Sequence, residues 1–243
     1  EDRIYVKITL PNIQEDSVEF HLPKIVPGTY RISDFGKFIH TFDAFDHLGN
    51  PLETSEISVN RWLVFGRPNR IEYWIDDTFD RMDGYDENFI FEPGGTSFEA
   101  ERNVFVLNNF GIIGYIDGYK NIPFELRIYH SKDTYGATAL DKKIINDTLD
   151  LYFADDYHYL VDGPIMYNQP DTLTKNIAGA EILISVFSPR RIVNAKDIME
   201  NIEDLMIAQS NYLGGTLPVK KYAYLIYLMD YPSLSKGMGA SSI

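Results

Sequence analysis

The segment 3-RIYVKITL-10 decides the fold of the first part of the chain, because its apolar side chains occupy every second position. The apolar residues are Ile4, Val6, Ile8 and Leu10, and they alternate with Tyr5, Lys7 and Thr9. An alternation with a period of two residues places the two sets of side chains on opposite faces of a β-strand. The segment therefore predicts a half-buried strand with one face toward a core.

The same alternation continues along the chain beyond this strand. It recurs in the segments 17–23, 60–65, 70–76 and 123–130. Turn sequences such as 27-PGTY-30 and 47-HLGN-50 separate these segments. Short strands joined by turns are typical of antiparallel sheets that pack face to face. We therefore expect residues 1–153 to form an N-terminal antiparallel β-sandwich domain.

The pattern changes near residue 150 to a strand, a helix and a second strand. The strand predicted at 181–188 precedes a helix with Asn194 as its N-cap and Asp197 in its first turn. Its apolar face is expected to consist of Ile198, Ile202, Leu205 and Met206. The helix is expected to end at Gly214 and Gly215. The segment 222-YAYLIYLMD-230 is apolar on both faces and predicts a buried strand. Residues 154–243 are thus expected to form a second part, which makes the chain mainly β with a smaller α/β part.

The composition argues against several classes of function. The chain of 243 residues has 36 acidic and 22 basic residues, which gives a formal net charge of −14. Binding to nucleic acid or to an anionic membrane requires clustered Lys and Arg, so neither partner is expected. The sequence contains no cysteine, which excludes disulfides, thiolate metal sites and cysteine nucleophiles. No apolar run approaches the roughly 20 residues of a membrane span.

No catalytic motif is complete in the sequence. A zinc peptidase helix needs His-Glu-x-x-His, which places two imidazoles one turn apart on the same face. The histidines are His21, His40, His47, His130 and His158, and none has a second histidine four residues further on. We assign ordinary surface or turn roles to His40 and His47. The Gly-x-Ser-x-Gly elbow and the phosphate-binding P-loop are also absent.

Two further segments are interpreted as loops without a ligand. The segment 94-GGTSFEA-100 contains glycines but lacks the Lys that a phosphate site requires, so a simple turn is expected. Asp80, Asp83 and Asp86 have roughly the spacing of a calcium loop. They lack the register and the closing Glu of an EF-hand, so we expect a solvated acidic loop.

Several stretches, taken in order, match a known family pattern of Pro-x-x-x-Pro-Gly-Ser/Thr-Tyr, then Asp-Phe, then Asn-Arg-Trp. The matching residues are Pro23, Pro27, Gly28, Thr29, Tyr30, Asp34, Phe35, Asn60 and Trp62. The segments 160-LVDGPIMY-167 and 213-LGGTLPVKKYAYL-225 also match. The chain thereby resembles the glycyl aminopeptidase family of zinc metallopeptidases, which often carry a PDZ domain. Each matching residue also has a structural interpretation, with Pro27 and Gly28 in a tight turn and Tyr30 and Trp62 in the core.

This resemblance implies a β-rich N-terminal domain followed by the first strand–helix–strand layer of a thermolysin-like catalytic domain. In the family, a strand with Gly-x-Leu-Glu-His binds the substrate as an added edge strand, and its Glu holds the substrate amine. This chain instead ends in 237-GMGASSI-243, so Gly237, Gly239 and Ala240 are the predicted substrate-binding residues of a truncated edge. No catalytic residue, metal ligand or cofactor is expected in this chain, and zinc is expected for the full-length protein.

The resemblance also implies an activity for the parent protein. It would hydrolyse N-terminal residues from peptides, with Gly and Ala favoured, and this chain alone is expected to be inactive. By analogy with similar bacterial proteins, the parent is expected to be exported to the periplasm or the cell surface.

Two other interpretations stay open. Tyr85, Phe89 and Phe91, beside the acidic loop, suit a non-catalytic β-sandwich module that binds a peptide or a glycan. The cut end of the chain is expected to expose apolar neighbours of the strand 222–230, which predicts a dimer induced by truncation.

Overall fold

The computed structural model describes residues 3–78, 90 and 94–228 of the chain. Two compact units are present, and each combines separate stretches of the sequence. Unit 1 consists of residues 1–98, 107–124 and 154–162, and unit 2 consists of residues 99–106, 125–153 and 163–243. The boundary that the sequence predicts between residues 153 and 154 stays a prediction. Within the described ranges, no helix is long and apolar enough to cross a membrane.

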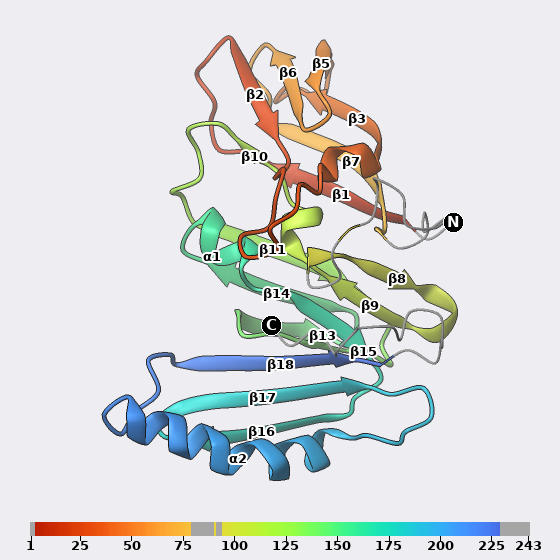
Figure 1. Cartoon of the computed structure of the whole chain (residues 1–243). Coiled ribbons are helices and arrows are strands. Elements are labelled where there is room, and N and C mark those ends of the chain that lie inside the picture. The colour runs from red at the N-terminus through yellow and green to blue at the C-terminus, as the bar shows by residue number, and fades with distance from the viewer. Residues whose placement is uncertain (1–2, 79–89, 91–93, 229–243) are drawn as a thin grey trace. The chain divides into compact units, whose positions relative to one another are not determined.

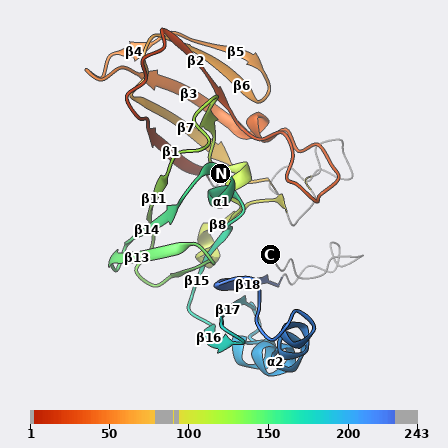
Figure 2. The same cartoon turned by 90° about the vertical axis from the view of Figure 1, so that its left-hand side faces the viewer.

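Unit 1 contains two four-stranded antiparallel sheets (Figures 1 and 2). The first sheet has the order β1 (Arg3–Thr9), β7 (Arg70–Asp76), β3 (Ile39–Phe45) and β4 (Pro51–Leu52). The second has the order β10 (Tyr115–Ile116), β2 (Ser17–His21), β6 (Arg61–Phe65) and β5 (Thr54–Ser58). The short helices of this unit are η1 (Phe35–Phe38), η4 (Asn109–Gly111) and α1 (Tyr157–Val161). In β1, Val6 is buried and Tyr5 and Lys7 are exposed, which confirms the alternation predicted for this strand.

Aromatic rings from both sheets of unit 1 meet between them. The ring of Phe42 on β3 lies 5.0 Å from Trp62 on β6 and 5.1 Å from Phe20 on β2, measured between centroids. Phe20 also lies 5.7 Å from Tyr73 on β7. Trp62 is buried, as the sequence predicts. These contacts pack rings of one antiparallel sheet against rings of the other, and large rings bury much apolar area in such a core.

The Asp-Phe and Asn-Arg-Trp parts of the family pattern, which we call the signature, lie in contact at helix η1. The Asn60 side chain donates from Nδ2 to Oδ1 of Asp34 at 2.7 Å, and its Oδ1 accepts from the backbone N–H of Gly36 at 2.9 Å. Phe35 follows Asp34 and is fully buried. One amide side chain therefore fixes the start of η1 to strand β6, which gives these residues a structural role.

The turn predicted at Pro27–Gly28 is confirmed, but the predicted burial of Tyr30 is wrong. Gly28 has φ +87°, and the Thr29 N–H donates to the Val26 carbonyl at 3.2 Å. Tyr30 is 97% exposed and has φ +54°. The left-handed backbone at Tyr30 directs its side chain to solvent, and neither a signature position nor an aromatic side chain guarantees burial.

Unit 2 contains three sheets, and most residues of each strand belong to this unit except in β8, of which only Glu99 does. The first sheet has the order β11 (Phe124–Tyr129), β14 (Leu149–Ala154) and β13 (Asp141–Asn146). The second has the order β12 (Tyr135–Ala137), β15 (Ile165–Asn168), β9 (Val104–Leu107) and β8 (Ser97–Glu99). The third has the order β16 (Thr172–Ile177), β17 (Ala180–Phe187) and β18 (Lys221–Tyr227). The helices of this unit are η3 (Ala100–Arg102) and α2 (Ala195–Tyr212).

The third sheet of unit 2 is covered on both faces. Helix α2 connects β17 to β18, which run parallel, and lies along one face of the sheet in both views (Figures 1 and 2). The opposite face carries Leu183, Ala223 and Leu225, which pack against Ala137 and Met166 of the second sheet. The burial predicted for the strand 222–230 is confirmed for Ala223, Leu225 and Ile226, but Tyr222 is 37% exposed. Residues 229 and 230 lie outside the described part.

Helix α2 begins and ends as predicted, but its buried face differs from the predicted apolar face by a rotation about the helix axis. Asn194 caps it by accepting from the Asp197 N–H at 3.0 Å, and Gly214 and Gly215 follow it with φ +97° and +101°. Leu205 is 56% exposed, so its predicted place on the apolar face is wrong. The residues that pack on the sheet are Ala195, Met199 and Met206, with Ile198 and Ile202 beside them. Leu205 precedes Met206 by one residue, which turns it about 100° away from this stripe.

Gly36 sits where no side chain fits, and its replacement by alanine tests the η1 contact. A Cβ atom there would lie 1.8 Å from the Val59 carbonyl oxygen, whereas a Cβ at Gly28 would meet nothing within 4 Å. We expect Gly36→Ala to lower the free energy of unfolding by about 3 kcal/mol or more, because backbone must shift. Gly28→Ala is the matched control and should cost only about 1 kcal/mol, for its left-handed φ. Urea denaturation measures both, and an equal loss in the two variants would contradict the steric account.

Candidate functional site

The predicted substrate-binding residues Gly237, Gly239 and Ala240 lie outside the described residues. The same holds for Asp80, Asp83 and Asp86 and for Tyr85, Phe89 and Phe91. The roles predicted for them therefore stay predictions. Two groups of side chains in unit 2 lie within the described part, and both combine charged and aromatic residues.

The first group, which we name the carboxyl-end cluster, consists of Glu99, Arg102, Phe187 and Tyr227. Because β17 and β18 are parallel, their carboxyl ends lie at the same edge of the sheet, and Phe187 is the register partner of Tyr227. The two rings stack with centroids 5.2 Å apart and planes 12° apart. In open α/β sheets, the carboxyl ends of parallel strands are the usual position of a binding site.

Glu99 places a carboxylate in this cluster from the end of β8. Its Oε1 accepts a hydrogen bond from the Tyr227 hydroxyl, and its Oε2 lies 3.2 Å from Nε of Arg102. The Glu99 side chain is 26% exposed. Both oxygens are thus engaged by donors, one of them a guanidinium, while the carboxylate stays partly open to solvent.

The structure corrects the interpretation of 94–100 as a simple turn, because Ser97–Glu99 forms strand β8. Three residues are too few for an alternation to be recognised in a sequence. The proximity of Glu99 to Tyr227 is also a long-range contact that no local pattern signals. Sequence analysis therefore missed this carboxylate.

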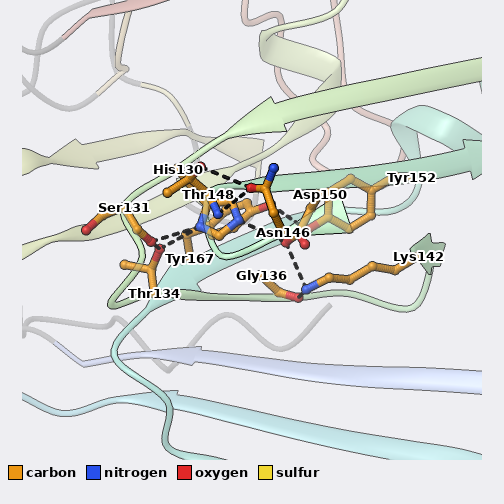
Figure 3. Close-up of polar contacts among 10 residues, drawn as sticks. All are labelled: His130, Ser131, Thr134, Gly136, Lys142, Asn146, Thr148, Asp150, Tyr152 and Tyr167. Atoms are coloured by element: carbon orange, nitrogen blue, oxygen red, sulfur yellow. Dashed lines mark hydrogen bonds and ion pairs between the residues drawn. The ribbon is translucent and has the colours of Figure 1, made fainter. Parts of the chain in front are cut away.

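The second group, which we name the buried network, surrounds Asp150. It consists of His130, Lys142, Asp150, Tyr152 and Tyr167, drawn with their neighbours in Figure 3. Asp150 is 2% exposed, and its Oδ2 lies 2.9 Å from Nζ of Lys142. Lys142 also donates to the Gly136 carbonyl at 3.0 Å. A buried carboxylate requires such compensation, because removal from water is costly for an unpaired charge.

Two tyrosine hydroxyls complete the polar contacts of Asp150. The distances are 2.7 Å between the hydroxyls of Tyr152 and Tyr167, 2.9 Å from Tyr167 to Asp150 Oδ2, and 3.2 Å from Tyr152 to the same oxygen. Two hydroxyl protons can serve only two of these three contacts. The two shorter distances indicate that Tyr152 donates to Tyr167, which donates to Asp150. Burial raises the pKa of both phenols, so they remain proton donors at neutral pH.

His130 lies at the border of the network. Its Nδ1 forms a hydrogen bond, whereas its Nε2 forms none with the described residues. Its Nδ1 lies 2.9 Å from the Ser131 carbonyl oxygen and 3.3 Å from Oγ1 of Thr134, which itself donates to that carbonyl at 2.7 Å. Nδ1 therefore carries a proton, since both neighbours accept. Nε2 is buried, forms no hydrogen bond with the described residues, and lies 3.5 Å from Oδ2 of Asp150.

The buried network has a structural role in unit 2. Tyr152 and Tyr167 are fully buried, and the side chains of His130 and Lys142 are 9% and 14% exposed. Asp150, Tyr152 and Lys142 belong to the sheet β11–β14–β13, whereas Tyr167 belongs to β15 of the neighbouring sheet. The network thus joins two sheets through polar contacts, and little solvent reaches it for a substrate to replace.

The histidines are not gathered into a metal site. His40 pairs with Asp76, which also binds Arg3, and the ring of His21 stacks on Tyr115 at 5.3 Å. Across residues 3–78, 90 and 94–228, no three His, Cys, Asp or Glu side chains are grouped so that they can hold a metal ion. The described residues therefore do not fit a zinc ion.

Comparisons with known proteins identify one matching family model and a set of solved structures with a similar fold. The family model described as the Peptidase M61 N-terminal domain matches residues 1–169. Among curated proteins, no sequence matches this chain.

Solved structures of aminopeptidases are similar to most of the chain. An aminopeptidase N family protein from Idiomarina loihiensis is similar over 93% of this chain, with a TM-score of 0.71 and 20% sequence identity. An M1 zinc metallopeptidase from Deinococcus radiodurans is similar over 93% of the chain, with a TM-score of 0.48 and 11% identity. The chain spans 36% of the first of these proteins and 52% of the second.

Removing the charge of Asp150 tests whether its pairing with Lys142 stabilises unit 2. We expect Asp150→Asn to lower the free energy of unfolding by about 3 kcal/mol, because the Lys142 ammonium loses its buried counter-charge. The double variant Asp150→Asn/Lys142→Met should recover much of this loss, since both charges are then gone.

Urea denaturation of the two variants measures the effect. Lys143→Met is the matched control, because Lys143 is exposed and forms no ion pair within the described part of the chain. A double variant as unstable as Asp150→Asn would show that the ion pair is not the source of the loss.

Proposed function

The chain belongs to the family of Peptidase M61 N-terminal domains, and we propose that it is the amino-terminal part of a zinc-dependent aminopeptidase. The family match over residues 1–169 supports this proposal. The fold likeness to an aminopeptidase N family protein over 93% of the chain supports it further. The parent protein would release N-terminal residues from peptides, with Gly and Ala favoured as in glycyl aminopeptidases.

The observation that carries the proposal is the carboxylate of Glu99 at the carboxyl end of β18. A peptide's N-terminal amine is a cation, and in this proposal it would compete with Arg102 for the partly exposed carboxylate of Glu99, whose other oxygen accepts from Tyr227. Gly237, Gly239 and Ala240, the residues predicted to form the substrate-binding edge, follow β18 in the sequence. We therefore propose that Glu99 contributes to holding the substrate amine beside that edge.

The zinc of this proposed enzyme would be held by residues that the chain does not contain. The described side chains do not fit the ion, and the sequence has no His-Glu-x-x-His. In this proposal the chain supplies substrate-binding surface and scaffold, and it is inactive alone.

Three further expectations belong to the same proposal. Export of the parent protein is proposed from the family resemblance, and so is the presence of a PDZ domain. The truncation-induced dimer stays a prediction. The alternative of a peptide- or glycan-binding module depends on Tyr85, Phe89 and Phe91, for which no contact is described, so the aminopeptidase is the better-supported function.

The isolated chain should bind no stoichiometric zinc and release no amino acid from peptides. Metal analysis after dialysis against zinc, together with hydrolysis of Gly- and Ala-p-nitroanilide, measures both properties. The parent protein, assayed under the same conditions, is the positive control. One equivalent of tightly bound zinc, or peptide hydrolysis by the isolated chain, would refute the proposal that the zinc is held by residues outside this chain.

Glu99→Gln in the parent protein tests the role of the carboxylate. We expect kcat/KM for an unblocked dipeptide to fall by about tenfold to a hundredfold, because a charge-assisted hydrogen bond to the amine is lost. Glu101→Gln, two residues away on η3, is the control and should leave kcat/KM unchanged. An unchanged value in Glu99→Gln, with normal zinc content, would exclude Glu99 from amine binding.

A further inference from the structure

Two aromatic side chains lie exposed next to each other on the outer face of the first sheet of unit 1. Tyr5 on β1 is 46% exposed and Trp74 on β7 is 44% exposed. The two residues are register partners, and their ring centroids lie 5.2 Å apart. Their neighbours along the strands, Val6 and Tyr73, are buried, so the exposed pair points away from the core between the sheets. We name the outer face of β1, β7 and β3 around this pair the aromatic platform.

The register of the three strands places further outward side chains beside the two rings. Strand β7 pairs with β1 on one side and with β3 on the other (Figure 1). Taken from β1 to β3, the central row is Tyr5, Trp74 and Thr41, and the next row is Lys7, Glu72 and Asp43. Adjacent strands lie about 5 Å apart and these rows about 7 Å apart, so the platform is a broad and open surface.

Most charged side chains at the platform are paired within the sheet. Nε of Arg3 lies 2.8 Å from Oδ1 of Asp76, and Asp76 also pairs with His40. Nε of Arg70 lies 2.7 Å from Oε1 of Glu72. These pairs satisfy each other, so they leave little net charge for an ionic ligand.

Four polar groups beside the Trp74 ring form no hydrogen bond or ion pair with the described residues. They are the indole N–H of Trp74 itself, the Thr41 hydroxyl, the Lys7 ammonium and the Asp43 carboxylate. Lys7 and Asp43 carry opposite charges, so the platform stays balanced on a chain whose net charge is −14. A balanced surface with both donors and acceptors favours an uncharged, hydroxyl-rich ligand over an ion.

The hydroxyl of Tyr5 is engaged within the sheet, unlike these four groups. Partial burial and a hydrogen bond with Glu72 raise the pKa of Tyr5. The phenol is therefore uncharged at neutral pH, and its partner restricts the rotation of the ring. What Tyr5 offers to a ligand is its ring, beside the ring of Trp74.

The chemistry of the aromatic platform matches a sugar better than it matches nucleic acid or protein. The negative face of an aromatic ring attracts the C–H groups on the flat side of a sugar ring, whose hydroxyls project from the rim. Single-stranded nucleic acid requires a positively charged groove, and the core of a protein interface is depleted of charge. The platform is balanced in charge, and charged side chains stand directly beside its two rings.

We propose that the aromatic platform binds a neutral, equatorially linked oligosaccharide of glucose or N-acetylglucosamine type. Such a chain is extended and flat, as the platform is. One sugar ring would stack on Trp74 with its hydroxyls at Thr41 and Asp43, and the next would lie against Tyr5 near Lys7. The site lies within β1, β7 and β3, so the proposal depends neither on the aminopeptidase activity nor on residues outside the described part.

Titration of the whole chain and of the parent protein with matched saccharides tests the proposal. The probes are cellotetraose, N-acetylchitotetraose, the curved isomer maltotetraose and the anionic glycan heparin. The sequence has two tryptophans and Trp62 is only 6% exposed, so quenching by acrylamide reports mainly on Trp74. We expect the first two saccharides to bind and to protect Trp74, with an affinity that hardly changes with salt because the ligand is uncharged. Maltotetraose should bind more weakly, since its chain curves away from a flat face.

Variants, measured by calorimetry, locate the binding on the platform. Trp74→Ala should weaken cellotetraose binding at least about tenfold, through the lost stacking, and Trp74→Phe should restore part of the loss. Asp43→Ala should weaken it about fivefold, through one lost hydrogen bond. Phe65→Ala is the matched control, because Phe65 is 42% exposed but lies on β6 in the other sheet of unit 1.

Four results would overturn the proposal. They are no binding of cellotetraose or N-acetylchitotetraose, tighter binding of maltotetraose or heparin than of these two, equal affinity in Trp74→Ala and Phe65→Ala, and a Trp74 that is shielded from acrylamide in the ligand-free parent protein. The last result would show that another part of the parent covers the platform. Thermal unfolding of each variant shows that the fold is intact, so a loss of affinity reports on the platform.

Discussion

The burial of both faces of the parallel pair β17–β18 is the constraint that organises unit 2. Parallel strands need a crossover, and the crossover helix α2 covers one face through Ala195, Met199 and Met206. The other face stays apolar and must be covered by something else, which Ala137 and Met166 provide. The sheet β16–β17–β18 therefore lies between helix α2 and the second sheet of unit 2. At the carboxyl ends of β17 and β18, Phe187 stacks on Tyr227, which donates a hydrogen bond to Glu99.

The two units achieve their internal packing by different means. Unit 1 fills the space between its sheets with rings, among them Phe20, Phe42 and Trp62, so its core is mostly apolar. Unit 2 joins two sheets through the buried charge of Asp150, with Lys142 and Tyr167 as partners. A polar junction tolerates fewer alternative arrangements than an apolar one, because each misplaced donor leaves a buried group unsatisfied.

Local patterns in the sequence predict the elements well and their long-range contacts poorly. The alternation in β1 and the cap at Asn194 are confirmed, because strand faces and helix caps depend on a few neighbouring residues. Leu205 and Tyr30 were misplaced, since tertiary packing sets the rotation of a helix and a left-handed φ redirects a side chain. Glu99 and Tyr227 are 128 residues apart. No spacing rule connects them, so the candidate site became visible only in three dimensions.

The interleaving of the two units along the sequence has a consequence for synthesis on the ribosome. Unit 1 receives its last element, α1, only when residues 154–162 have emerged. That element matters to the unit, because the Tyr157 hydroxyl donates to the Ile113 carbonyl at 2.6 Å and Asn109 donates to the Leu160 carbonyl at 3.0 Å. Unit 1 therefore stays incomplete while residues 125–153 of unit 2 are being made. The apolar surface that α1 covers in unit 1 is therefore exposed during synthesis for longer than it would be in a chain with two consecutive domains.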